Sequence, residues 1–222
     1  MQAVIGLFII LFVALVIYAF YAAAQRRKAL GAWARRRGLR FDSSKDDGMA
    51  DGFPEFGCLH EGSDRYAYNV SRGEWNGRPM TAFDYHYETG SGDDKSSHHF
   101  SAVILGSPIP LKPLHIRREH FFDKITEFFG FDDIDFESAE FSRRFHVKST
   151  DKRWAYDVIH QGMMEHLMSA PEFSIQFGVM YVIAWRSATF KPKDFEAAAE
   201  LIRGMFARLP SYLVSQQTGE SA

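Results

Sequence analysis

The sequence predicts an α+β protein, in which an N-terminal transmembrane helix precedes one domain with a mainly antiparallel sheet and about three packed helices. An apolar run opens the chain at 3–23. In the remainder, hairpin signals outnumber strand–helix–strand patterns, which favours antiparallel pairing. Helical periodicity of the apolar residues marks the segments 119–129, 151–168 and 193–208.

The length and composition fit one globular domain plus a tether. The chain has 222 residues, of which 46% are hydrophobic and 24% are charged, and its formal net charge is -2. A single cysteine, Cys58, excludes an intrachain disulfide and a four-cysteine zinc site. We find no phosphate-binding loop, dinucleotide fingerprint or nucleophile elbow. The sequence therefore predicts no cofactor, and it counts modestly against an enzyme without excluding one.

Residues 1–24 carry no charged side chain, and at about 1.5 Å per residue they can cross a hydrocarbon core of about 30 Å. A cleaved signal peptide is the alternative, because the small residues at 22–24 could form a cleavage site. The start of the chain lacks Lys and Arg, however, and the apolar run exceeds the usual length of about 7–15 residues. We therefore predict one uncleaved span.

A cationic flank follows the span directly, with seven Lys and Arg and no acid between 25 and 40. The positive-inside rule then predicts a single-pass inner-membrane protein, with its N-terminus outside and its C-terminal domain in the cytoplasm. These cations either set the topology alone or also contact anionic lipid. The candidates for lipid contact are Arg26, Arg27, Lys28, Arg35, Arg36 and Arg37.

The remainder of the chain is acidic, with 19 cations against 28 acids. Such a body should stand off an anionic leaflet, and it lacks the basic footprint that nucleic-acid binding requires. A polar stretch rich in Gly, Ser and Asp separates the cationic flank from the first predicted strand. We accordingly divide the chain into a span (1–24), a basic juxtamembrane segment and polar linker (25–64), a globular domain (65–213) and a disordered tail (214–222).

Within the domain, Asn76-Gly77 lies between two extended segments, 66–71 and 79–87, and predicts a hairpin because both residues tolerate positive φ. A third strand follows at 98–105, alternating apolar residues predict a strand at 141–148, and a short strand is predicted at 173–177. The segment 179–185 is apolar on both faces, which predicts a buried central strand. The clearest helix is 193–208.

One candidate for metal chemistry lies on this hairpin. Asp84 and His86 share one face of the second strand, and His98 or His99 would join them if the third strand pairs alongside. Imidazoles and a carboxylate on one face suit Zn²⁺ or another divalent ion. Adjacent histidines point to opposite faces, so Asp84, His86 and His98 are a weak set, and a solvated hairpin face is the favoured alternative.

Three aromatic residues are candidates for a binding surface: Trp75, Tyr85 and Tyr87. Exposed, they would form a recognition patch. Buried, they would be ordinary sheet packing, which suits the two tyrosines better. The position of Trp75 in a turn favours exposure.

Two stretches carry a resemblance. The hairpin sequence at 72–79 that leads into Phe83-Asp84-Tyr85-His86-Tyr87, and the later segment at 136–147, resemble a group of bacterial membrane-anchored proteins of unknown function. The similarity spans roughly 65–209. It implies membrane tethering and a bacterial envelope setting, and it carries over no catalytic or binding residue.

The sequence thus predicts a membrane-anchored cytoplasmic binding or scaffolding module that recruits a protein or small-molecule partner. A membrane-tethered, metal-assisted hydrolase that uses Asp84, His86 and one of His98 or His99 is an alternative. With inverted topology, the domain would be an envelope-facing binding domain.

Overall fold

The computed structural model describes residues 2–118 and 132–218. Within these residues a sheet of nine strands has the order β1-β2-β3-β4-β9-β8-β5-β7-β6, and neighbouring strands are antiparallel. The strands are β1 (Arg40–Asp42), β2 (Ser63–Trp75), β3 (Arg78–Thr89), β4 (Ser96–Gly106), β5 (Leu114–Arg118), β6 (Asp132–Asp133), β7 (Phe145–Ser149), β8 (Ser174–Phe177) and β9 (Tyr181–Arg186). The predicted α+β class with a mainly antiparallel sheet is confirmed.

The helices are α1 (Gln2–Arg36), α2 (Met49–Gly52), α3 (Ala139–Arg144), α4 (Lys152–Val158), α5 (Gln161–Ser169), α6 (Pro192–Phe206) and α7 (Ser211–Thr218), with short 3-10 turns at Gly57–Leu59 and Gly92–Asp94. The predicted helix at 193–208 corresponds to α6, and the one at 151–168 is divided into α4 and α5. The predicted helix at 119–129 lies outside the described residues.

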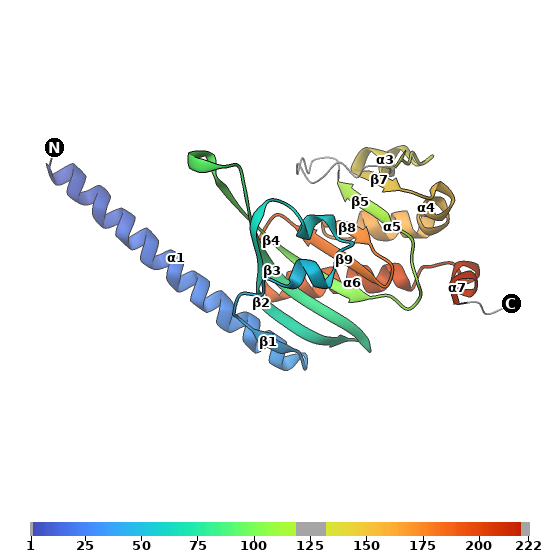
Figure 1. Cartoon of the computed structure of the whole chain (residues 1–222), viewed down its shortest axis with the longest axis horizontal. Coiled ribbons are helices and arrows are strands. Elements are labelled where there is room, and N and C mark those ends of the chain that lie inside the picture. Colours follow the sequence, from blue (N-terminus) through green and yellow to red (C-terminus); the bar gives the residue numbers. More distant parts are fainter. Residues whose placement is uncertain (1, 119–131, 219–222) are drawn as a thin grey trace.

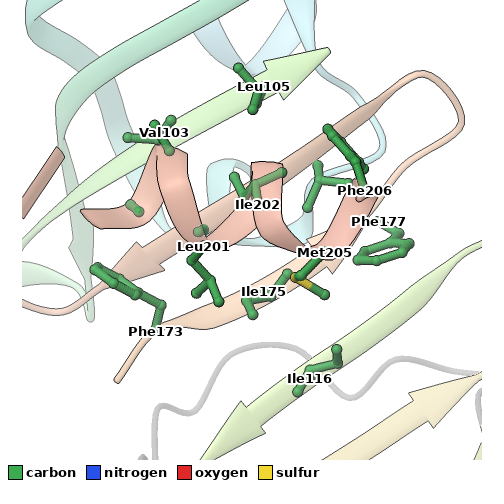
Figure 2. Close-up of a cluster of buried hydrophobic side chains, with 14 of the residues drawn as sticks. Val103, Leu105, Ile116, Phe173, Ile175, Phe177, Leu201, Ile202, Met205 and Phe206 are labelled. Carbon is green, nitrogen blue, oxygen red and sulfur yellow. The ribbon is translucent and has the colours of Figure 1, made fainter. Parts of the chain in front are cut away.

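Helix α6 covers one face of the sheet centre. Its apolar stripe packs on side chains of β4, β5, β8 and β9, as Figure 2 shows for Ile202 and Met205 near Val103, Ile175 and Phe177. The helix begins with Pro192 at its first position, where the missing N–H costs no hydrogen bond, and Asp194 accepts from the backbone N–H of Lys191. The same core contains buried residues from α4, α5 and the last turns of α1.

The opposite face is covered by the segment that the sequence predicts to be a polar linker. Phe56, Cys58 and Leu59 are at most 1% exposed and pack on Phe83, Phe100 and neighbouring strand residues. The strand β1 pairs with β2, and Asp46 pairs with Arg72. The part of 25–64 that the sequence predicts to be a polar linker is therefore packed on the domain, because a few buried apolar residues within a polar segment are enough to fix it on the sheet.

The predicted tail is also shorter than expected. Helix α7 includes residues 214–218 of that segment, and Leu213 within the helix is 2% exposed. Residues 219–222 lie outside the described part of the chain.

The predicted hairpin turn is confirmed, with φ of 49° at Asn76 and 76° at Gly77. The next hairpin, β3–β4, is long and is paired from Met80–Leu105 to Thr89–Ser96. Its tip projects from the same end of the domain as the N-terminal half of α1 (Figure 1). Apart from Gly6, the residues of α1 from Val4 to Gln25 are exposed, and by length and composition the helix could cross a membrane.

Candidate membrane-proximal site

A buried ion pair joins the end of the apolar helix to the sheet. The Arg26 guanidinium donates to both carboxylate oxygens of Asp84 at 2.7 and 2.8 Å. It also donates to the carbonyl oxygen of Phe190 at 2.9 and 2.6 Å. The Asp84 side chain is fully buried and that of Arg26 is 22% exposed. We call Arg26 and Asp84 the clamp.

A β-bulge completes the hydrogen bonding around Asp84. Two residues of β2, Asn69 and Val70, oppose Phe83 alone, and Asn69 has a φ of 51°. The Asn69 amide donates to Asp84 at 2.8 Å. From β4, the Ser101 hydroxyl donates to the same carboxylate and accepts from the backbone N–H of Phe190. Every charge in the clamp is thus paired and hydrogen-bonded, as burial in the domain requires.

The last turns of α1 add a second attachment. Trp33 stacks on Phe195 of α6 with ring centroids 5.6 Å apart, and its indole N–H donates to Glu196 at 2.8 Å. Arg37 donates to the same carboxylate at 2.9 and 2.7 Å and lies over the Trp75 ring. Because one continuous helix contains both the apolar span and these contacts, the domain is fixed to the span rather than suspended from a flexible linker.

This geometry changes the interpretation of the cationic flank. Arg26 and Arg37 are held by carboxylates of the domain, so their assignment to lipid contact is corrected. Arg27 and Lys28 are exposed and lie within the first turn after the apolar run. Arg35 and Arg36 are also exposed, but they lie about 12 Å further along the helix axis at about 1.5 Å per residue. Only Arg27 and Lys28 keep a position that suits headgroup contact.

Beyond the clamp, four rings on the same sheet face lead toward the β3–β4 hairpin. We call Tyr66, Tyr68, His86 and His99 the membrane-proximal surface. His86 lies between two of these rings, with centroids 4.6 Å from Tyr66 and 4.8 Å from His99. The Tyr68 hydroxyl is 3.3 Å from His99 Nδ1. The Lys45 ammonium lies 3.7 Å from the Tyr66 ring centroid.

The four side chains of this surface carry polar groups, and three of them are partly or fully buried. Burial and the nearby Asp84 carboxylate raise the pKa of Tyr68 to about 12. Partial burial, together with the neighbouring His86, lowers the pKa of His99. Tyrosines that are half in water and half in an apolar setting are typical of the boundary between bilayer and water.

The predicted metal set does not assemble. Asp84 is fully engaged in the clamp, and His98 pairs with Tyr87 on the opposite face, where their rings stack at 4.8 Å. His99, rather than His98, lies beside His86. The sequence leaves open which histidine faces His86, because the choice depends on the register of β3 and β4.

The three aromatic candidates do not form an exposed patch, in line with the burial that the sequence favours for the two tyrosines. Trp75 is 8% exposed, and its indole donates to Glu200. Tyr85 is 1% exposed, its hydroxyl donates to the carbonyl of Leu59, and burial raises its pKa to about 12. Tyr87 is half-buried against Phe100. Trp75 and Tyr85 belong to the core and Tyr87 packs against it, whereas sequence reasoning missed Tyr66 and Tyr68, which alternate on the neighbouring strand.

No protein-family model and no curated protein sequence matches this chain. Among solved structures, the chain is similar to the crystal structure of the mycobacterial trehalose monomycolate transport factor A, TtfA. The two are 13% identical, with a TM-score of 0.64, and the match covers 83% of this chain and 96% of that one. At this identity the likeness shows the fold alone. The combined picture is that of an α+β domain anchored by an N-terminal helix of membrane-spanning length.

Proposed function

We propose that this chain is a single-pass inner-membrane accessory protein whose cytoplasmic domain binds a component of a lipid-transport system at the bilayer surface. The observation that carries the proposal is the clamp. An ion pair between Arg26, close after the apolar run, and the sheet fixes which part of the domain lies nearest the membrane. A simple tether would not need this contact.

Charge supports the cytoplasmic orientation. Arg27 and Lys28 remain exposed directly after the span. Retention of such a flank in the cytoplasm follows from the positive-inside rule.

Transport as the setting rests on the likeness to TtfA, a trehalose monomycolate transport factor. The membrane-proximal surface supports this part of the proposal. Its tyrosines and histidines are on the side of the sheet that would contact lipid headgroups or the membrane domain of a transporter. The proposed partner is therefore a membrane component rather than a soluble one.

Orientation can be tested with reporters that are active only in the cytoplasm or only in the periplasm, fused after Ala222. Cytoplasmic activity with an intact N-terminus is expected. Periplasmic activity, or loss of 1–24, would contradict the proposed location.

Function can be tested in the native bacterium by deleting the gene and comparing envelope lipids by mass spectrometry. A lipid or its precursor should accumulate, and the full chain should restore the profile. A Gly-Ser-Gly-Ser insertion between Ala24 and Gln25 keeps the anchor but uncouples the domain, so it should fail to restore the profile. The same insertion appended after Ala222 is the matched control. An unchanged lipid profile in the deletion strain, or full rescue by the uncoupled chain, would refute the proposal.

A further inference from the structure

We propose a divalent transition-metal site at Asp64, His86 and Glu88, at the base of the projecting β3–β4 hairpin. One ligand atom from each residue lies within 4.8 Å of the other two. This set shares only His86 with the one that the sequence predicts, and the proposal is independent of any role in lipid transport.

The three groups lie next to a second β-bulge. Asp64 and Arg65 of β2 oppose Tyr87 alone, and Asp64 has a φ of 48°. Asp64 is two residues before Tyr66, the pairing partner of His86, and its Oδ2 lies 3.5 Å from His86 Nε2. Glu88 is two residues beyond His86 on β3 and therefore lies on the same sheet face as His86.

Gly62 fixes this bulge. Its φ is 59°, and a Cβ there would lie 2.0 Å from the carbonyl oxygen of Glu88. The chain can approach β3 this closely only with glycine at this position. The backbones that carry Asp64 and Glu88 are thereby held next to each other.

His86 is the residue that points to a ligand. Its side chain is 8% exposed, and its Nδ1 is buried without a hydrogen-bond partner among the described residues. Its Nε2 lies 3.5 Å from Asp64 Oδ2, beyond the usual range of about 2.7–3.2 Å for an N–H···O hydrogen bond. A metal ion between the imidazole and the two carboxylates would take this Nε2 as its ligand.

The donor set selects the kind of ion. One imidazole nitrogen and two carboxylates suit Zn²⁺ and similar first-row ions, whereas Ca²⁺ prefers six or more oxygen ligands. Three protein ligands leave coordination positions open. Asp64 is 60% exposed, so an ion could enter from solvent.

Lys95 offers a way to distinguish metal binding from a purely structural role of the cluster. Its ammonium donates to Glu88 Oε2 at 2.8 Å and would compete with a cation for that carboxylate. Removing this lysine should therefore strengthen metal binding, which a merely structural role of the cluster would not predict.

The test titrates Zn²⁺ into the full chain in detergent, produced without a polyhistidine tag, against a chromogenic chelator. One tightly bound Zn²⁺ per chain is expected. His86→Ala and the exposed variant Asp64→Asn should each weaken binding by about 100-fold, by comparison with losses of about 10–100-fold for groups that only support ligands. Lys95→Met should tighten binding. The control, His98→Ala, removes a histidine from the opposite face and should leave binding unchanged.

Three outcomes would overturn the site. They are the absence of saturable Zn²⁺ binding up to about 1 mM, an equal loss in His98→Ala, and Ca²⁺ binding as tight as that of Zn²⁺. Because Asp64 is exposed, Asp64→Asn should fold normally, so its result is decisive even where His86→Ala disturbs the sheet.

Discussion

Replacing Arg26 with methionine should destabilise the domain by about 3 kcal/mol, although the residue lies only just beyond the apolar run. The Asp84 carboxylate is fully buried and accepts from Arg26, Asn69 and Ser101. Without the guanidinium it would lose its strongest donors and its counter-ion. Breaking a buried pair in this way costs about 3–5 kcal/mol. We take the lower end because Arg26 is 22% exposed, so that water can partly replace it.

A double-mutant cycle separates this charge effect from lost packing. Asp84→Asn alone leaves the guanidinium facing a neutral amide and should also destabilise the domain. Combining Arg26→Met with Asp84→Asn removes both charges, so the two losses should not add. We expect a coupling energy of at least about 1.5 kcal/mol.

The assay is urea unfolding of the full chain in detergent, followed by tryptophan fluorescence. The chain has 4 tryptophans, and all of them lie in the domain rather than in the apolar span. Additivity of the two single changes within about 0.5 kcal/mol would show no coupling between the two side chains. A loss below about 1 kcal/mol for Arg26→Met would show that the pair behaves as a surface ion pair. Either result would refute the description of the junction as a buried clamp.

Three further predictions concern the core. Burial, with Arg117 and Lys148 nearby, lowers the pKa of His115 from 6.5 to about 3. The unfolded state therefore binds the extra proton, so the urea midpoint should fall as the pH drops from 6.5 toward 3, and His115→Gln should flatten this dependence. Burial raises the pKa of the Cys58 thiol, so maleimide should label it only after unfolding; rapid labelling of the native chain would contradict its place in the core. Trp33→Ala should cost about 3–5 kcal/mol in the same urea assay through lost stacking on α6, whereas Trp33→Phe should cost less.

The local sequence pattern correctly predicts the first hairpin turn and helix α6. The turn at Asn76-Gly77 follows from two residues that tolerate positive φ, and α6 follows from its apolar stripe and the proline at its start. The pattern was misleading at 141–148, where alternating apolar residues predict one strand. In the structure, α3 ends at Arg144 before β7 begins. Ser138 caps that helix by accepting from the backbone N–H of Phe141, and the alternation of apolar residues does not register such a cap.

The sequence by itself determined the span, the cationic flank and the α+β class, because hydrophobicity and periodicity are properties of neighbouring residues. Only the tertiary structure decided what Arg26, Asp84 and His86 do. Arg26 and Asp84 are 58 residues apart in the chain, and they meet because α1 continues from the span into the core. His86 lies beside Asp64 because β2 and β3 pair in a register that sets Tyr66 opposite His86, with a bulge at Asp64 and Arg65. A shift of one residue changes which side chains share a sheet face, and no local pattern encodes it.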